Sequence, residues 1–461
     1  MNRTGRFSEL EMGDVENIPH LKRFGECYQA DPEFRESYNR DPAALLRKHG
    51  LNLEPTHLSD LLQRLDARSP AFIQSLHEGP GLKILRKLQT ERIADERFEA
   101  WRRRQVKRIQ AFFHTEVFRS LLHLPMAFEL SKGCSGSCFF CCFDPPPLSA
   151  VFPHNEVNRR LWREILSISN RLVGPLFGAG APCYYATEPL DNPDYERLAQ
   201  DFREITGFWP PLTTVKCLED PKRIRKYIRA VSADSDHPVL LRFSVISLRM
   251  LREVHAEYSP EELADVELVL NNPESMWKYS PAGRARRIAQ SSGQRGDRMA
   301  EKFYMPGPTA CATGFVVNLV DRSIRLVASC TPDEQNRQGY ILFDSMDFET
   351  SADYERALEE LIVRHMPAFP LDDWILAFSP GFKLNATEEA CLFSTDFMTR
   401  RLAGDSSFVK MCELIGEGRY TWTELSAIFG DAWITEMYLK PKLSLLFDWG
   451  LLREPPTTRR R

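Results

Sequence analysis

The sequence predicts a mixed α/β protein whose centre is a partial TIM-like barrel of about six βα units. Short apolar runs alternate with helical patterns over residues 123–350, as they do in βαβ units with a parallel sheet. Apolar residues before this region recur at helical spacing, and the residues after it alternate like short antiparallel strands before helices return. We therefore expect a flexible N-terminus, a helical region, a barrel with a hairpin, a smaller C-terminal module and a disordered tail, at residues 1–18, 19–122, 123–350, 351–455 and 456–461.

Composition places the chain among ordinary globular proteins. Its 461 residues are enough for two to four domains, and 43% hydrophobic with 27% charged residues is a typical balance. The net charge of -4 gives no general case for nucleic acid binding. The first residues lack the apolar core of a signal peptide, and no run approaches the ~20 apolar residues of a membrane span. Eleven cysteines without paired spacing fit a reducing compartment, so we expect a cytoplasmic protein.

The region before the barrel is expected to be helical. Two Asp-Pro pairs offer helix starts. A basic segment near its end could attract an acidic peptide, but acidic residues precede it and favour a solvated helix face. The apolar residues at helical spacing are Leu21, Phe24, Tyr28, Phe34 and Tyr38, and the basic residues are Arg102, Arg103, Arg104, Lys107 and Arg108.

Six strands are expected in the barrel. The last of them should turn at residues 321–323 into an antiparallel partner. In a barrel of this kind the chemistry lies at the carboxyl ends of the strands, where the loops converge. The expected strands are residues 126–131, 182–186, 212–218, 237–247, 265–272 and 314–329.

Three cysteines lie close together directly after the first strand. In LSKGCSGSCFFCCFDPPP, residues 130–147, Cys134, Cys138 and Cys141 are carried on a loop with glycine and serine, and Phe140 precedes the third. Thiolates at this spacing can converge on one metal centre. The stretch resembles the signature of the radical SAM superfamily, which implies a [4Fe-4S] cluster with one iron open for S-adenosyl-L-methionine. A zinc site or a buried thiol cluster is the alternative, although zinc usually takes a fourth protein ligand.

An acidic motif follows the second expected strand. Glu188 lies in ATEPLDNPD, which resembles the Gly-Gly-Glu motif of radical SAM enzymes, where the acid accepts hydrogen bonds from the ammonium group of the cofactor. Ala186 and Thr187 replace the two glycines. Further candidate cofactor contacts are Arg242, Ser244 and Ser247 on the fourth strand, since a guanidinium can grip a carboxylate and a serine can bond a ribose, and Asn271 and Asn272 on the fifth. A structural salt bridge and turn formation are the alternatives, and Arg284 and Arg286 are weaker candidates.

The candidate hydrogen-donating thiols are Cys142, Cys183, Cys217, Cys311 and Cys330. Cys183 begins its strand and Cys311 precedes its own, so both should lie at the closed end of the barrel. Cys217 ends the third strand and Cys330 ends the hairpin, so both could face the opening. Cys391 and Cys412 are too far apart in the sequence to suggest a second cluster.

The run GFVVNLVDRSIRLVASCTPDEQNRQGYILFD, residues 314–344, resembles the corresponding part of the PoyD-like radical SAM peptide epimerases. The resemblance implies conversion of L to D residues in a ribosomal precursor peptide, with Cys330 as hydrogen-atom donor. Cys217, at the end of the third strand, is the second choice, and a packing role is the alternative for these thiols. The resemblance also implies an external electron donor of the flavodoxin or ferredoxin type. The alternatives are another single-cluster maturase that forms carbon–carbon or thioether links, and a non-catalytic peptide-binding or iron–sulfur protein.

Two stretches bear on the precursor. Residues 31–53 resemble the helical leader of nitrile-hydratase-like precursors, although a helical scaffold explains them equally well. The C-terminal module of small strands followed by helices resembles a winged helix, in particular the PqqD-like recognition element (RRE) of peptide-modifying enzymes. An exposed edge strand there would capture a leader by adding it to the sheet; a purely structural cap is the alternative. No nucleic acid or membrane partner is expected.

Overall fold

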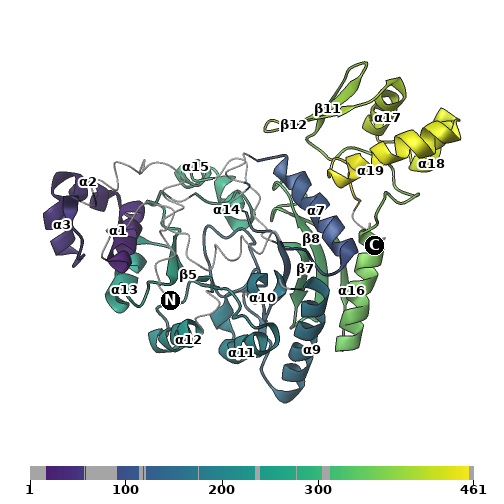
Figure 1. Ribbon diagram of the computed structural model, residues 1–461. Helices are drawn as coiled ribbons and strands as arrows, with labels where there is room; N and C mark the ends of the chain where they lie inside the picture. Colours follow the sequence, from purple (N-terminus) through teal and green to yellow (C-terminus); the bar gives the residue numbers. More distant parts are fainter. Residues whose placement is uncertain are drawn as a thin grey trace.

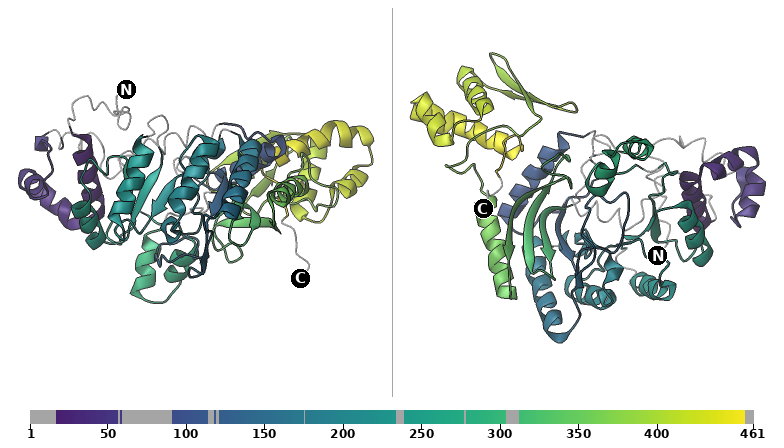
Figure 2. Two further views of the ribbon diagram at one scale, coloured as in Figure 1. Left: turned by 90° about the horizontal axis from the view of Figure 1, so that it is seen from below. Right: turned by 180° about the vertical axis from the view of Figure 1, so that it is seen from behind.

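The computed structural model describes residues 17–56, 58, 91–113, 118, 121–174, 176–233, 239–276, 278–303 and 312–455. The predictions for residues 1–16, for helices between 59 and 90, for Cys311 and for the tail 456–461 lie outside these residues. A central α/β body carries the N-terminal helices at one end and the C-terminal module at the other (Figures 1 and 2). Within the described residues, no helix has the length and apolar character needed to cross a membrane.

The N-terminal unit is three short helices, α1 Ile18–Ala30, α2 Pro32–Arg40 and α3 Pro42–Lys48. The two predicted Asp-Pro starts are confirmed, because Asp31 and Asp41 accept backbone N–H bonds at the first turns of α2 and α3. The predicted apolar residues form one cluster with later leucines, so the unit has a small core of its own. Its buried members include Leu21, Phe24, Phe34, Tyr38 and Leu46.

Only part of the basic face that we predicted for helix α7, Glu96–Gln110, is solvated: Arg103 is exposed and pairs with Glu99, but the other arginines of that face are not exposed. Arg104 is 1% exposed, and its Nη2 lies 3.3 Å from Glu454 Oε2. Arg108 Nη2 lies 2.9 Å from Glu454 Oε1, and Arg102 is buried and donates to the carbonyl of His123. For these arginines the prediction was wrong, because it considered only residues nearby in the sequence. The carboxylate that pairs with Arg104 and Arg108 belongs to Glu454, near the far end of the chain.

The first and last predicted strands lie side by side. β1 Leu124–Glu129 pairs in parallel with β7 Ala312–Asn318, which pairs antiparallel with β8 Ser323–Ser329, and β8 with β9 Tyr340–Asp347. The predicted hairpin turn is confirmed, since Asn318 pairs with Ser323. The resulting sheet has the order β1-β7-β8-β9.

The third, fourth and fifth predicted strands form a second, parallel sheet. It contains β4 Leu212–Thr214, β5 Leu241–Val245 and β6 Val266–Leu270 in that order. All three strands are shorter than predicted. The described strands form four separate sheets, none closed, so the six-unit barrel remains a prediction.

The predicted second strand, residues 182–186, is not a strand. It makes one isolated bridge, between Tyr184 and Glu129, while Phe128 N donates to Pro182 O at 2.8 Å. Tyr184 Oη also lies 2.8 Å from Thr213 Oγ1 of β4, so the segment lies between the two sheets. Pro182 cannot donate a backbone bond, and Ala186 leaves the extended conformation at φ 54°, which explains why no ladder forms.

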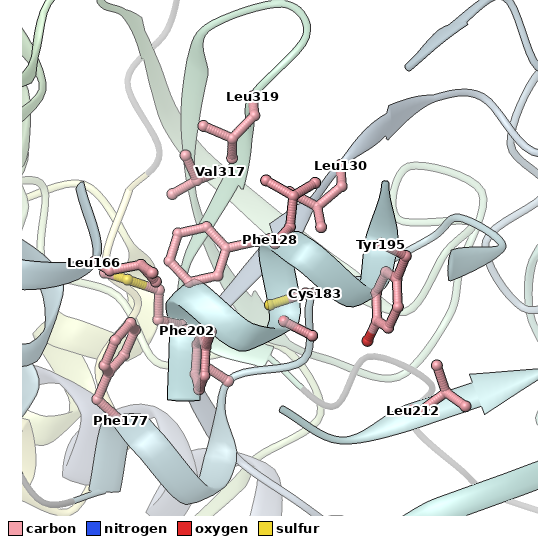
Figure 3. Close-up of a cluster of buried hydrophobic side chains, with 14 of the residues drawn as sticks. Phe128, Leu130, Leu166, Phe177, Cys183, Tyr195, Phe202, Leu212, Val317 and Leu319 are labelled. Carbon is pink, nitrogen blue, oxygen red and sulfur yellow. The ribbon is translucent and has the colours of Figure 1, made fainter. Parts of the chain in front are cut away.

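Helices cover the outer side of the two larger sheets of the body, and the central core lies between the helices and the sheets. Phe128 of β1 packs against Phe177, whose ring in turn packs against Phe202, and Cys183 is buried in the same cluster (Figure 3). Full burial of such side chains stabilises the fold by about 1.5–3 kcal/mol each. The helices are α9 Glu156–Val173, α10 Leu176–Gly180, α11 Tyr195–Thr206, α12 Pro221–Ala233, α13 Leu248–Glu257 and α16 Ser351–His365. Two further helices, α14 Gly283–Ala289 and α15 Gln294–Glu301, pack on each other away from the sheets.

The C-terminal module has the predicted order of small strands followed by helices. Its antiparallel sheet of β10 Lys383–Ala386, β11 Ala390–Ser394 and β12 Thr399–Ala403 packs on the helices over a separate core. Cys391 and Cys412, distant in sequence, are both fully buried in this core. The helices are α17 Ser406–Glu417, α18 Trp422–Phe429, a π-helix over Ile434–Leu439 and α19 Lys440–Asp448.

Candidate cofactor site at the cysteine loop

The three cysteines lie on a loop, residues 133–147, whose ends are held together. Below it, β2 Ser131–Lys132 pairs with β3 Ala150–Val151. At its neck, Cys134 N donates to Pro146 O at 3.0 Å. Gly133 has φ 80°, and a Cβ there would lie 2.3 Å from Pro147 O, so only glycine fits this crossing. We call residues 133–147 the cysteine loop.

Two of the thiols face one point. A Cβ added to Gly136 would lie 3.4 Å from Cys134 Sγ and 3.5 Å from Cys138 Sγ, so the missing side chain leaves a cradle between them. Burial raises the pKa of Cys134 to about 11 and that of Cys138 to about 12. Cys141 is half-buried further along the loop. Across the described ranges, no three Cys, His, Asp or Glu side chains stand close enough together to hold a metal ion. The soft thiol donors Cys134 and Cys138 and the cradle between them fit two of the three ligands of an iron–sulfur cluster. Cys141 would have to move closer to these two thiols to supply the third.

Glu188 is 4% exposed, and its side chain lies beside the carboxyl end of β4. Its Oε1 accepts from Thr214 Oγ1 at 2.5 Å and Leu190 N at 3.2 Å, and its Oε2 accepts from Val215 N at 3.0 Å. Burial raises the pKa of Glu188 to about 7, although these three donors oppose the shift. Ala186, which stands in the place of a glycine of the family motif, adopts the left-handed conformation that normally favours glycine.

Asp191 and Asn192, which the sequence analysis did not single out, join this acidic turn to the cysteine loop. Asp191 Oδ2 accepts from Ser135 N at 2.8 Å and its Oδ1 from Ser135 Oγ at 2.5 Å, and Lys216 Nζ lies 3.0 Å from Oδ1. Asn192 Nδ2 donates to the carbonyls of Leu130 and Phe152, on either side of the loop neck. The signal was present, since both follow Glu188 within four residues in the motif that carried the resemblance.

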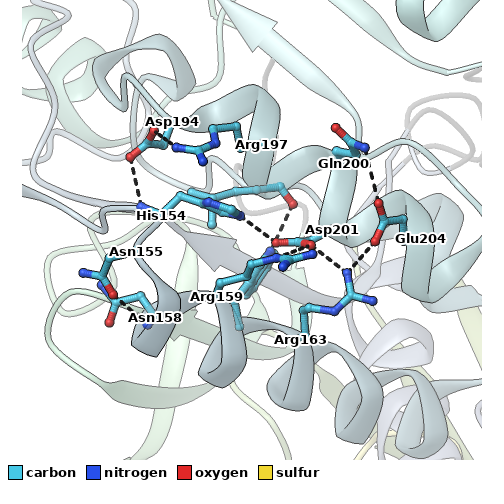
Figure 4. Close-up of polar contacts among 12 residues, drawn as sticks. His154, Asn155, Asn158, Arg159, Arg163, Asp194, Arg197, Gln200, Asp201 and Glu204 are labelled. Atoms are coloured by element: carbon cyan, nitrogen blue, oxygen red, sulfur yellow. Dashed lines mark hydrogen bonds and ion pairs between the residues drawn. The ribbon is translucent and has the colours of Figure 1, made fainter.

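The following carboxylates hold other parts of the structure. Asp194 accepts a hydrogen bond from His154 N at 2.9 Å. Asp201 lies between α9 and α11, where its carboxylate contacts the side chains of His154, Arg159 and Arg163 (Figure 4). None of these described contacts reaches the cysteine loop. The connection between the acidic turn and the loop is therefore specific to Asp191 and Asn192.

Helix α14 covers the other end of the cysteine loop. The carbonyl of Cys141 accepts from Arg284 N at 2.8 Å, and Arg284 Nε donates to Asp144 at 2.7 Å. A Cβ on Gly283 would lie 2.1 Å from Cys142 O, which shows how closely the two backbones approach. Arg284, a weak candidate from the sequence, thus holds the loop through its backbone and side chain.

An aromatic cluster lies beside this contact. The ring of Phe140, which precedes the third cysteine, lies 5.5 Å from Phe139 and 6.1 Å from Tyr279 between centroids. Tyr279 Oη donates to the carbonyl of Asn271 at 2.9 Å. The aromatic position of the cysteine motif therefore connects the loop to the end of β6.

The candidates on the strands are placed in different ways. Arg242 and Ser244 share one face of β5, as predicted, and Arg242 Nε donates to Thr213 Oγ1 at 3.1 Å. Ser247 instead caps α13 by accepting from Met250 N.

The remaining polar candidates take part in backbone contacts. Asn271 is buried, and Asn272 Nδ2 donates to the carbonyl of Ala30 in the N-terminal unit. Arg286 donates to Pro332 O and pairs with Glu334. Arg286 and Asn272 therefore attach neighbouring segments, outside the thiol cradle.

The two preferred donor thiols lie in places that the sequence did not indicate. Cys217 is fully buried in the central core, so its thiol does not face an opening. Cys330 follows β8, which runs back from the hairpin, and neighbouring Ser329 donates to Ala312 O where β7 begins. Cys330 is therefore at the amino end of β7, not at the carboxyl end. The segment after Cys330 still reaches the cysteine loop, because Gln338 Nε2 donates to Phe143 O at 3.2 Å.

The chain is similar to a protein of Sinorhizobium fredii (strain NBRC 101917 / NGR234), described as the uncharacterized protein y4wI. The two are 27% identical over 453 residues, which is 95% of this chain and 87% of the relative. No family model and no solved structure matches the chain. The similarity spans nearly the whole chain and assigns no activity.

Proposed function

We propose that the protein is a radical SAM peptide epimerase, which converts L to D residues in a ribosomally made precursor peptide. The observation that carries the proposal is that the three-cysteine loop and the Glu188 turn, distant in sequence, are joined directly through Ser135 and Asp191. In the family that the sequence resembles, these two motifs serve one cofactor. The cradle at Gly136 further supports it.

In this proposal Cys134, Cys138 and Cys141 hold a [4Fe-4S] cluster, and Glu188 accepts the ammonium group of S-adenosyl-L-methionine. When bound, the reduced cluster and its cofactor supply a radical that removes hydrogen from an otherwise inert carbon. Glu188 has a bond to only one described donor at Oε2, so a carboxylate lone pair is left to accept another. Arg242 is suited to the cofactor carboxylate, and Ser244 and Asn271 to its hydroxyl groups.

Cys330 is the proposed donor of the returning hydrogen atom: it lies at the amino end of β7, but the segment that follows it contacts the cysteine loop through Gln338. Burial, together with Asp333, raises the pKa of Cys330 to about 12, so the thiol keeps its S–H at neutral pH. The S–H bond breaks as the new Cα–H bond forms, which leaves a sulfur-centred radical. One electron and one proton restore the thiol, and an electron donor of the flavodoxin or ferredoxin type would supply the electron. We place these steps in a reducing, cytoplasmic setting.

The test is a reaction in heavy water. The reconstituted, reduced protein is incubated with S-adenosyl-L-methionine and a precursor with a nitrile-hydratase-like leader, and the peptide is examined by mass spectrometry and chiral analysis. We expect one deuterium per converted residue and no other mass change. A loss of two hydrogens would instead indicate crosslinking, and absence of 5'-deoxyadenosine would contradict the enzymatic proposal.

The donor is tested by substitution. Cys330→Ala should abolish deuterium uptake and leave 5'-deoxyadenosine formation detectable, while Cys391→Ala, in the separate C-terminal core, serves as the control thiol. If uptake persists in Cys330→Ala, the donor is another residue, and Cys217→Ala is the next variant.

A further inference from the structure

Asp191 has an unusual position for a carboxylate in a turn. Its side chain is 1% exposed, although Ser135 above it is exposed. Both oxygens are used: Oδ2 by the backbone N–H of Ser135, and Oδ1 by the Ser135 hydroxyl and Lys216 Nζ. A buried carboxylate persists only when its charge is paired and hydrogen-bonded, and Asp191 meets both conditions through Ser135 of the loop and Lys216, which follows β4.

Asp191 binds Ser135, which lies in the sequence between the two cysteines whose thiols share the cradle. Ser135 separates Cys134 from Gly136, whose N–H donates to Cys134 Sγ at 3.3 Å. Holding the N–H and hydroxyl of Ser135 fixes the backbone on both sides of it. The conformation that leaves the cradle between Cys134 and Cys138 thus depends on a side chain more than fifty residues away in sequence.

We propose that Asp191 is a positioning residue that holds the cysteine loop in the conformation able to receive the cluster. The inference rests on the proposed function as far as the cluster is concerned. Its structural part, that Asp191 keeps the loop closed, stands apart from that function and can be tested without any cofactor. Asp191 itself touches neither thiol in any described contact.

The first experiment uses the full-length protein without cofactor. A thiol reagent is added, and mass spectrometry follows the labelling of Cys134 and Cys138 separately. Asp191→Asn replaces a charged acceptor by a neutral one, which should shift loop opening by about tenfold or more. The labelling rate of Cys138 should rise by that factor, whereas a rise confined to Cys134 would report only the lost charge of Asp191, which acts on that thiol, and would overturn the inference. The matched control is Asp194→Asn, which removes a nearby carboxylate that holds His154 and not the loop.

A double-variant cycle separates positioning from a general loss of structure. Ser135→Ala removes the hydroxyl bond only, so it should give part of the effect of Asp191→Asn. The double variant should exceed Asp191→Asn alone by little, because both changes break the same contact. Additive effects, or labelling rates equal to those of the unaltered protein, would overturn the inference.

The second experiment reconstitutes iron and sulfide. We expect Asp191→Asn to lose iron to a chelator about tenfold faster than Asp194→Asn. If the unaltered protein binds no iron and sulfide, the proposed function fails and the labelling experiment still decides the role of Asp191. If all three proteins lose iron at one rate, the proposed function stands and the positioning role is refuted.

Discussion

Burial disfavours the charged form of Glu188, so the contribution of this residue to stability depends on pH. Its pKa in the folded protein is raised to about 7 by burial, against an ordinary value of 4.5. A folded-state pKa raised in this way contributes stability that is fully present below pH 4.5 and is lost as the pH rises through 7. The residue that the proposed function assigns to the cofactor is thus also a source of pH-dependent stability.

Glu188→Gln should remove this pH dependence. Urea unfolding at pH 5 and pH 8 should show a smaller fall in the free energy of unfolding for the variant than for the unaltered protein. The amide keeps an acceptor for Thr214, so the fold should persist. Parallel pH profiles for the two proteins would show that the Glu188 carboxyl is not perturbed as described.

The attachment of helix α1 to α13 depends on a buried carboxylate. Glu26 is 3% exposed, it pairs with Lys22, and its Oε2 lies 3.0 Å from His255 Nε2. Burial alone would raise the pKa of Glu26, but Lys22 and His255 outweigh it and lower the pKa to about 2. A lowered pKa contributes stability that is present above pH 4.5 and is lost as the pH falls towards 2.

Glu26→Gln should therefore loosen the N-terminal unit at neutral pH. Removing one partner of a buried ion pair costs about 3–5 kcal/mol. Hydrogen exchange should show lost protection in α1 with little change in α9. Glu36→Gln, at an exposed position on α2, is the control and should leave exchange unchanged. Equal protection in both variants would mean that other contacts hold α1, among them the hydrogen bonds that Arg23 donates to the carbonyls of His255 and Tyr258.

Elements with their own local signal could be predicted from the sequence, and those that depend on distant partners could not. Asp31 and Asp41 marked their helices because capping is decided within four residues. The burial of Arg104 and Arg108 could not be seen, because Glu454 is about 350 positions away. Residues 182–186 were apolar enough for a strand, but Pro182 and the turn at Ala186 limit them to one bridge.

The candidate site shows the same division. The cysteine motif and Glu188 could be found by pattern, since each keeps a short fixed spacing. The position of Cys330 depended on the direction of β8, and counting along the hairpin would have placed it at the start of β7. Cys391 and Cys412 share one core because β11 packs on α17, which no sequence spacing reports.

At the scale of the whole molecule, Glu454 attaches the C-terminal module to the central body. It is 1% exposed at its side chain and accepts from Arg104, Gln105 and Arg108 of α7. Its removal would leave two mostly buried guanidinium groups without their carboxylate, a situation that costs about 3–5 kcal/mol when one buried partner is lost.

Glu454→Ala should free the module from α7 while both cores persist. Limited proteolysis should then cut between α16 and β10, and small-angle scattering should show a larger radius of gyration. Glu417→Ala removes an exposed partner of Arg419 and should have almost no effect. A compact, protease-resistant Glu454→Ala protein would show that other contacts hold the module.

The N-terminal unit and the C-terminal module lie at opposite ends of the body (Figures 1 and 2). A peptide bound at either end would have to extend over the body to reach the cysteine loop. If the protein modifies a precursor peptide as proposed, a leader held at either end would leave the residue to be modified on a spacer. The effective concentration of that residue at the cysteine loop is greatest when the spacer matches the span, and it falls as the spacer lengthens. Under the proposed function, shortening the precursor should therefore change which residues are converted, with a cut-off set by the end of the body that holds the leader.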